Sequence, residues 1–237
     1  MSSKRKVKKV KADCLPDKFV VINCPDKKGH EKWYKGRSLA NFPCPSRILL
    51  CGIPNCGKSL TIKNILLHSK PLYDRLIVVS CTKETEDFNE LEPHLILDRL
   101  PSIESFDRNY TENALVLDDY KPKTPIEKAN MERFFGYVST HCNTTIFYAT
   151  QDVFSIFSPV IRRESNVFIL WKSFDQMQLQ MIAKRVGMTY DSIAQIMKDL
   201  EFGNKDSLCI DMTDGTPAKL RKNLFQVIQE VQVPDTE

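Results

Sequence analysis

The sequence predicts an α/β fold with a mostly parallel sheet flanked by helices, and three observations support this. Five short apolar runs, each as long as a buried strand, alternate with segments of helical periodicity. A GxxxxGK[ST] loop at residues 52–59 joins the first two of these elements. The strand, helix and strand that surround it have the spacing of a right-handed parallel crossover. Helices on both faces of such a sheet explain why the runs are continuously apolar.

The elements follow one another in a regular order. A short strand at residues 19–23 precedes a turn-rich stretch. We expect the five core strands at residues 47–52, 75–80, 113–119, 144–150 and 166–172. A helix to about residue 68 follows the glycine-rich loop, whereas Pro93 and Pro101 exclude one long helix over residues 91–107.

The third core strand is followed by a predicted helix over residues 124–142. Thr124 can cap it and Pro125 suits its first turn, while Ile126, Ala129, Phe134 and Val138 form an apolar face.

The last third predicts two amphipathic helices at residues 175–186 and 190–201, a strand at 207–212, a turn and an irregular end. We divide the chain into a disordered basic tail (1–12), a lead-in that packs on the core (13–45), a P-loop domain (46–212) and a C-terminal extension (213–237).

Length and composition are those of a soluble globular protein with one domain. The chain has 237 residues, of which 42% are hydrophobic and 27% charged. No apolar run approaches the roughly 20 residues that cross a bilayer, so no membrane-spanning segment is expected. The first residues lack the apolar region of a signal peptide.

The net charge of +4 is unevenly distributed. Six basic residues and no acidic one lie in residues 1–11, and the rest of the chain has 28 basic and 30 acidic residues. The body is therefore not a strongly basic nucleic-acid binder. The tail is predicted to be a nuclear localisation signal, an arm on nucleic-acid phosphates or a solubilising end.

Eight scattered cysteines without a CxxC pair predict reduced, buried thiols. A zinc site from Cys14, Cys24, His30 and Cys44 is an alternative, but its spacing fits no metal motif.

The glycine-rich loop predicts a nucleoside triphosphate site. Its backbone amides and the amino end of the next helix would cradle the phosphates, Lys58 would reach the β- and γ-phosphates, and the Ser59 hydroxyl would ligate Mg²⁺. The predicted ATP-binding residues of this Walker A loop are Gly52, Pro54, Asn55, Cys56, Gly57, Lys58, Ser59 and Leu60.

Two acids end the third core strand. Adjacent carboxylates at a strand end repel each other, which makes a bound cation the better explanation than two solvated turn residues. Asp118 would serve Mg²⁺ as the Walker B acid, and Asp119 would orient or deprotonate the attacking water.

Three further polar residues extend this site. Gln151 follows the fourth core strand, where it can hydrogen-bond the γ-phosphate or the attacking water. Arg162 and Arg163 precede the fifth strand, and one of them, Arg162 first, is a candidate arginine finger that acts on a neighbouring subunit. The alternative is a surface salt bridge to Glu164.

Together these residues resemble the viral genome-packaging ATPases of the FtsK/HerA superfamily. The likeness is strongest to the poxvirus-type enzymes of nucleocytoplasmic large DNA viruses, virophages and polinton-like elements. It rests on residues 52–59, Asp118–Asp119, Gln151 and the Pro-x-x-Arg segment at residues 159–162, and it covers residues 45–175.

The resemblance implies a RecA-like P-loop ATPase core with a strand added between the P-loop and acidic strands. It also implies a homo-oligomeric ring of five or six subunits that moves double-stranded DNA into a preformed capsid, with capsid or portal-vertex proteins as partners. Many members have Glu at the position of Asp119, so Glu84 is an alternative base. The host nucleus, a cytoplasmic virus factory and the virion are the expected locations.

Other functions remain open at this stage. A helicase or another P-loop NTPase that acts on single strands would share the sheet, and Tyr120 is the aromatic residue near the acidic strand that it could use. A nucleotide kinase lacks an Arg-rich lid, and a GTP switch lacks an NKxD motif, since residues 204–207 have the wrong spacing. A protein that binds ATP without hydrolysing it would not need both acids.

Overall fold

The computed structural model describes residues 42–69, 73–80, 86–106, 112–151, 158–171, 176–216 and 218–228. Its helices are α2 (Lys58–His68), α3 (Pro125–Arg133), α4 (Ser139–His141), α6 (Pro159–Glu164), α7 (Gln176–Val186) and α8 (Tyr190–Asp199). Its strands are β1 (Arg47–Cys51), β2 (Arg75–Ser80), β3 (Leu95–Leu97), β4 (Asn113–Asp118), β5 (Thr144–Thr150), β6 (Val167–Trp171), β7 (Ser207–Asp211), β8 (Leu220–Lys222) and β9 (Gln226–Val227). Short 3₁₀ turns lie at Glu86–Leu91 and Ile103–Ser105.

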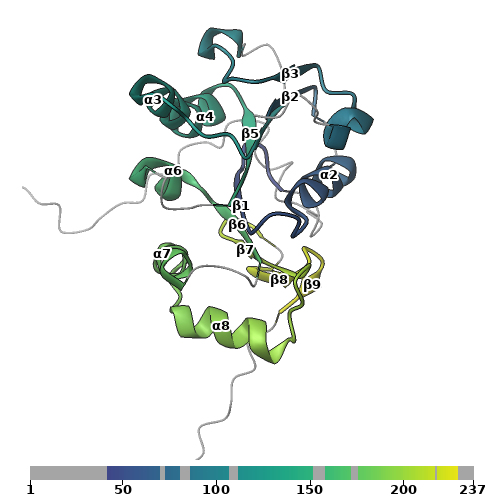
Figure 1. The fold of residues 1–237 in the computed structure, drawn as a ribbon, viewed down its shortest axis with the longest axis vertical. Helices are drawn as coiled ribbons and strands as arrows, with labels where there is room; N and C mark the ends of the chain where they lie inside the picture. Colours follow the sequence, from purple (N-terminus) through teal and green to yellow (C-terminus); the bar gives the residue numbers. More distant parts are fainter. Residues whose placement is uncertain are drawn as a thin grey trace, which may run out of the picture.

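The described strands form one sheet in the order β3-β2-β4-β5-β1-β6-β7-β8-β9 (Figure 1). Neighbours from β3 to β6 run parallel, and β7, β8 and β9 continue the sheet in antiparallel pairs. The predicted mostly parallel α/β fold is confirmed. Strand β5 lies between the P-loop strand β1 and the acidic strand β4, as the resemblance implies.

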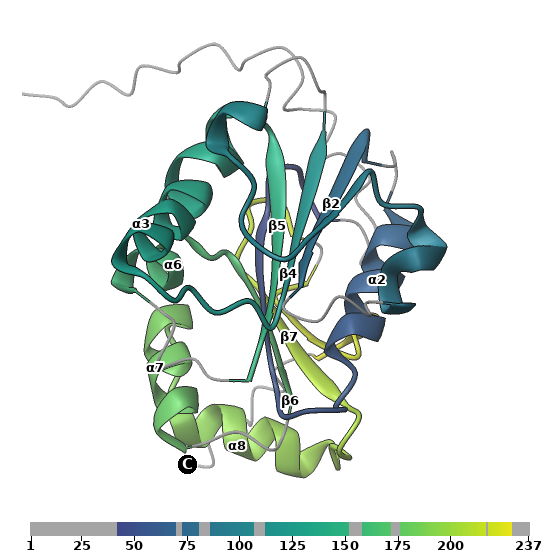
Figure 2. The same ribbon diagram turned by 45° about the horizontal axis from the view of Figure 1, so that its top comes forward.

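Helices cover both faces of the sheet. Helix α2 packs on one face, and α3, α4, α6 and α7 pack on the other (Figures 1 and 2). Because side chains alternate along a strand, Ile48 and Leu50 join the core under α2, whereas Leu49 joins the core on the other face. Full burial of each such side chain contributes about 1.5–3 kcal/mol, so the strands at the centre of the sheet are firmly held.

The predicted helix at residues 124–142 begins as expected but does not stay α-helical. Thr124 Oγ1 accepts a hydrogen bond from the Glu127 amide at 3.2 Å, and the Glu127 carboxylate accepts one from the Thr124 amide at 3.1 Å. Residues Phe134–Val138 then form a π-helical turn. Such a turn changes the helix phase, and it buries Phe134 and Val138 completely. The predicted apolar face was wrong at Ile126, which is 74% exposed, and at Ala129, which is also exposed.

Three strands form in two segments for which the sequence predicted no strand. Residues 91–107 contribute the short edge strand β3, and the residues after 213, predicted to be irregular, add β8 and β9. A buried ion pair holds β8 on β7: Arg221 Nη2 lies 2.6 Å from Asp211 Oδ2, and neither side chain is exposed. A buried charge is costly unless it is paired, so removal of either partner would leave an uncompensated charge between β7 and β8.

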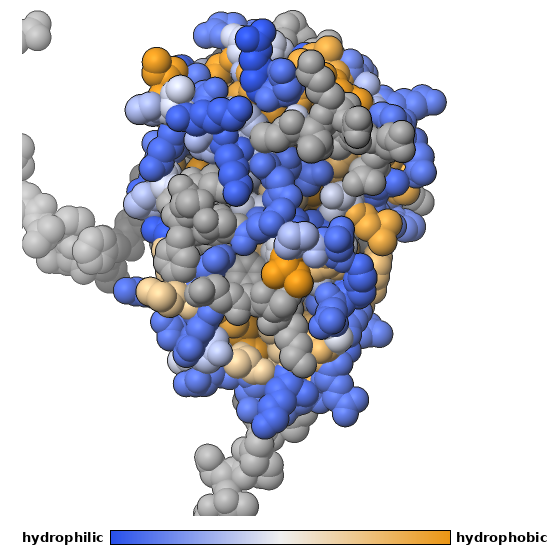
Figure 3. All heavy atoms as spheres, viewed as in Figure 1, coloured by the Kyte–Doolittle hydropathy of each residue, from blue (hydrophilic) through white to orange (hydrophobic). Residues whose placement is uncertain are grey.

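No helix within the described ranges is long and apolar enough to cross a membrane. On the face that Figure 3 shows, apolar side chains lie scattered among hydrophilic ones. The basic tail, the strand predicted at residues 19–23 and most of the lead-in lie outside the described residues. Phe42 and Cys44, at the end of the lead-in, are buried.

Candidate nucleotide site

The loop between β1 and α2 wraps around the start of the helix. Asn55 and Gly57 have positive φ angles of 61° and 113°, which turn the chain sharply before α2 begins at Lys58. The Lys58 ammonium folds back on the loop and donates to the carbonyls of Gly52 at 2.9 Å and Ile53 at 3.0 Å. The loop therefore already has the curved form that a phosphate chain needs.

Gly52 stands at a crowded point below this loop. A Cβ at this position would lie 2.5 Å from Cys56 Sγ and 3.1 Å from Cε3 of Trp171. Any larger residue would push the loop away from β6, so glycine is required here by packing. Gly52 and Cys56 are buried beneath the loop and shape it from below.

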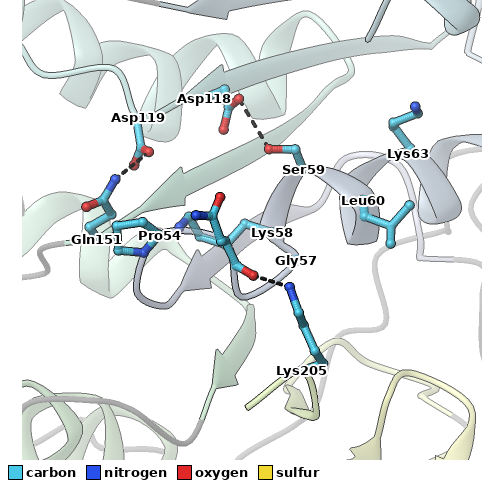
Figure 4. Close-up of a pocket in the computed structure, with 11 residues that line it drawn as sticks. Pro54, Gly57, Lys58, Ser59, Leu60, Lys63, Asp118, Asp119, Gln151 and Lys205 are labelled. Carbon is cyan, nitrogen blue, oxygen red and sulfur yellow. Dashed lines mark hydrogen bonds between the residues drawn. The ribbon is translucent and has the colours of Figure 1, made fainter. Parts of the chain in front are cut away.

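A hydroxyl and a carboxylate meet at the amino end of α2. Ser59 Oγ donates a hydrogen bond to Asp118 Oδ2 over 3.4 Å (Figure 4). Asp118 ends β4, two strands away from β1, and reaches Ser59 because all three strands end at the same edge. Mg²⁺ prefers such oxygen ligands and usually keeps several waters, so the pair fits this ion.

The next two predicted residues also lie together. Asp119 has a positive φ of 47°, which turns its side chain out of the line of β4. Its Oδ2 accepts a hydrogen bond from Gln151 Nε2 at 2.8 Å, and Figure 4 shows the two side chains pointing at each other. A carboxylate fixed in this way is well placed to orient a water molecule.

These groups line one cavity of about 460 Å³ at the carboxyl ends of the strands. Its wall contains Pro54, Asn55, Gly57, Lys58, Ser59, Leu60, Lys63, Asp118, Asp119, Gln151 and Lys205. Every predicted nucleotide or metal residue outside the arginines contributes to this wall or, like Gly52 and Cys56, lies directly beneath it. Their individual roles stay predictions.

Two lysines of the wall were missed by the sequence analysis. Lys63 lies one helical turn after Ser59 on α2, so helical periodicity could have found it. Its ammonium is 3.0 Å from Glu90 Oε2. Lys205 comes from the turn before β7 and hydrogen-bonds the Asn55 carbonyl, 150 residues away in sequence. No local sequence signal links those two residues.

The candidate arginines lie elsewhere. Arg162 and Arg163 are in the last turn of α6, which ends two residues before β6 begins and is therefore far from the strand ends that form the cavity. Arg163 Nε pairs with Glu164 at 3.0 Å, and the arginine side chain is 70% exposed. Arg162 Nη1 contacts Met181 Sδ at 3.8 Å. The salt-bridge alternative is thus present for Arg163, and the finger role stays a prediction.

A third arginine, unforeseen from sequence, supports this segment. Arg185 on α7 donates from Nε to the Arg162 carbonyl at 3.0 Å and from Nη2 to the Arg163 carbonyl at 2.6 Å. These carbonyls lie at the end of α6 and lack helical partners. Arg185 therefore caps the helix and holds the backbone from which the Arg162 and Arg163 side chains extend.

The described cysteines, Cys44, Cys51, Cys56, Cys142 and Cys209, are all buried free thiols, as predicted. Burial raises the pKa of Cys44 to about 12 and also raises the pKa of Cys56, so both stay protonated at neutral pH. The alternative base Glu84 and three of the four residues of the zinc alternative lie outside the described part of the chain.

The chain matches no protein-family model and no curated protein. Its fold is similar to the genome packaging NTPase B204 from Sulfolobus turreted icosahedral virus 2, solved in complex with AMP. The TM-score is 0.55 at 16% identity, over 78% of this chain and 98% of that chain. The complex of the same protein with AMPPCP gives 0.52 at 16% identity, over 78% and 99%.

The DNA-packaging ATPase B204 from Sulfolobus Turreted Icosahedral Virus gives a TM-score of 0.52 at 14% identity, over 78% of this chain and 99% of that chain. At such identities the likeness is one of fold. It confirms the predicted P-loop fold class, and the resemblance to viral packaging ATPases holds at the level of the fold.

Proposed function

We propose that this protein is an ATPase that translocates double-stranded DNA and packages a viral genome into a preformed capsid. One observation carries the proposal: the P-loop, the Ser59–Asp118 pair and the Asp119–Gln151 pair converge in one cavity, on the fold of a viral packaging NTPase. This convergence supports the hydrolysis of ATP by groups of one subunit.

The chemical step follows from the positions of these side chains. Lys58 leaves the loop carbonyls to bind the β- and γ-phosphates. Asp119, oriented by Gln151, accepts a proton from the attacking water as its oxygen bonds to the γ-phosphorus. The bond to the β–γ bridging oxygen breaks, which yields ADP and inorganic phosphate.

Mg²⁺ is the metal that these residues would hold. Ser59 would ligate it directly and Asp118 through water, and the ion would neutralise charge on the β- and γ-phosphate oxygens. Lys58 would add a second positive charge next to the phosphates. Lys63 and Lys205 are the further lysines among the described residues that line the cavity.

A neighbouring subunit would complete the site. Arg162 and Arg163 cannot reach the cavity of their own chain from the far end of β6, which is the arrangement that a finger acting in trans requires. A homo-oligomeric ring would bring one of them to the next P-loop. Five or six subunits are proposed for this ring.

Exposed loops of the protein would bind the DNA. Lys121 and Lys123 follow the acidic strand directly and are exposed, so a change at Asp119 can move them. In a ring, these few charges per subunit would concentrate in one pore.

The single-strand helicase alternative loses support in the structure. Tyr120, the aromatic residue near the acidic strand, is 3% exposed, and its carbonyl accepts a hydrogen bond from Tyr148 Oη at 2.9 Å. Tyr120 is part of the core and does not offer a ring on which bases could stack.

The test is ATP hydrolysis measured across protein concentrations with no DNA, with double-stranded DNA and with single-stranded DNA. We expect a rate that rises with protein concentration and is stimulated by duplex DNA. Stimulation by single strands alone would favour the helicase instead, and full activity in Lys58→Ala would contradict the catalytic assignment. Capsid or portal-vertex partners, and a location in the host nucleus, a virus factory or the virion, are part of the proposal.

A further inference from the structure

Lys205 approaches the nucleotide cavity from the side opposite the acids. In the sheet, β5 and β4 lie on one side of the P-loop strand β1, and β6 and β7 lie on the other. Asp118 ends β4, Asp119 and Gln151 directly follow β4 and β5, and Lys205 lies two residues before β7 begins. Figure 4 shows Lys205 reaching the P-loop from the part of the cavity away from Asp119 and Gln151.

The turn that carries Lys205 is held by several contacts. Asp206 Oδ2 accepts a hydrogen bond from the Gly203 amide at 2.8 Å, and Asp206 Oδ1 accepts one from Asn223 Nδ2 at 2.6 Å. The Asn223 hydrogen bond lowers the pKa of Asp206, which keeps this carboxylate charged beside Lys222, 3.4 Å away. Trp171 Nε1 donates to the Lys205 carbonyl at 3.2 Å. The backbone of Lys205 is therefore fixed on both sides.

The side chain has capacity left for a ligand. A lysine ammonium donates up to three hydrogen bonds. Among the described residues, its hydrogen-bond partner is the carbonyl of Asn55, the loop residue that lines the cavity. The lysine is exposed and lines the cavity, so its remaining donors and its aliphatic stem are accessible to a ligand there.

The position of the acids decides which part of a nucleotide meets this lysine. Asp119 and Gln151 mark the γ-phosphate end, and the loop amides with the start of α2 cradle the phosphate chain. The nucleoside must then extend to the other side of β1, toward Leu60 and Lys205.

We propose that Lys205 is a nucleoside-binding residue of the ATP site, supplied by the C-terminal part of the chain. This inference rests on the proposed ATP binding. The ammonium stays anchored on Asn55 and donates to ribose oxygens, and the stem packs against the base. Lys205 thus links the β7–β8 end of the sheet to the presence of a bound nucleotide.

The experiment measures dissociation constants by isothermal titration calorimetry for ATP, ADP and inorganic tripolyphosphate. It compares the full chain with Lys205→Met, which keeps most of the stem and removes the charge. Lys184→Met serves as the matched control, because Lys184 is an exposed lysine on α7 outside the cavity wall. Thermal melts establish that the variants fold.

For Lys205→Met we expect ATP and ADP to bind about tenfold more weakly, the typical effect of losing a charged hydrogen bond, with tripolyphosphate changed less than about twofold. Lys184→Met should match the unmodified chain. A loss confined to ATP, or an equal loss for tripolyphosphate, would place Lys205 on the phosphates and overturn the proposal, as would no loss at all. If the unmodified chain does not bind ATP, the proposed ATPase function itself is contradicted.

Discussion

The two sides of the nucleotide cavity are built differently. On the β4 and β5 side, Asp118, Asp119 and Gln151 lie at or directly after the strand ends, so the parallel sheet itself brings them together. On the β6 and β7 side, Lys205 arrives through an antiparallel return and a turn held by Asp206 and Trp171.

The difference teaches how each side can be inferred. A parallel sheet places the carboxyl ends of its strands at one edge. The position of the side with Asp118, Asp119 and Gln151, here called the reaction side, therefore follows directly from strand order. The side with Lys205, here called the nucleoside side, depends on contacts between segments that are distant in the sequence. The following predictions test whether catalysis and nucleoside binding divide between the two sides in this way.

The largest effect is expected where a neighbouring subunit completes the reaction side. Arg162→Ala should lower the turnover number about 10³- to 10⁵-fold, the effect of losing an arginine finger, with little change in ATP affinity. The rate is measured by phosphate release at saturating ATP and DNA.

The matched variant is Arg163→Ala, expected to have a smaller effect because Arg163 is already paired with Glu164. A mixture of Arg162→Ala and Lys58→Ala proteins should regain part of the activity, since some interfaces then have one intact finger and one intact loop. Turnover that does not depend on protein concentration would show that neither arginine acts as a finger on a neighbouring subunit.

A somewhat smaller effect is expected within one subunit. Asp119→Asn should reduce turnover about 10²- to 10⁴-fold, the typical contribution of a general base, while ATP and ADP bind normally. Asp119→Glu, which keeps a carboxylate, is the control and should retain more activity in the same phosphate-release assay. If Asp119→Asn remains fully active, the base lies elsewhere, and Glu84→Gln becomes the variant to measure.

Between the two sides lies Gly52, and a substitution there should disturb both. Gly52→Ala places a methyl group 2.5 Å from Cys56 Sγ, and overpacking of this kind costs about 1–3 kcal/mol. The melting temperature should fall by about 2–4 °C for each kcal/mol. Gly136→Ala is the control, because an added Cβ there meets nothing within 4 Å. Equal melting temperatures for the two variants would show that Gly52 is not crowded.

The smallest effect should come from Glu112, which lies at the other edge of the sheet and belongs to neither side. Burial, and then Asp74, raises the pKa of Glu112 from 4.5 to about 7. Between these values the folded state holds a proton that the unfolded state has lost, so the contribution of Glu112 to stability is greatest below about pH 4.5 and declines toward pH 7.

Thermal melts at pH 5 and pH 8 check this effect. The melting temperature of the unmodified chain should fall over this interval through deprotonation of Glu112, and Glu112→Gln should remove that part of the fall. An unchanged pH dependence in the variant would assign the titration to other groups.

The sequence predicted the elements whose signals are local. The five core strands, the loop at residues 52–59 and the cap at Thr124 were all predictable from apolar runs, spacing and capping residues. The residues of the reaction side followed from them, since each lies next to a predicted strand end.

The sequence could not supply the features that depend on packing. The π-helical turn at Phe134–Val138 buries Phe134, Phe135 and Val138, and β8 has two charged residues in its three, so no local pattern predicts either element. The buried Arg221–Asp211 pair joins β8 to β7, and Lys205 reaches the cavity from the turn before β7, so both features depend on residues far apart in the sequence.

The indole of Trp171 is a fluorescent probe that contacts both sides of the cavity. It packs against Gly52 below the phosphate loop, is 1% exposed, and donates to the carbonyl of Lys205. Its fluorescence therefore depends on both the loop and the lysine turn. The sequence has two tryptophans, Trp33 and Trp171. A Trp33→Phe protein would thus carry one tryptophan, whose emission would report nucleotide binding if the proposed function holds.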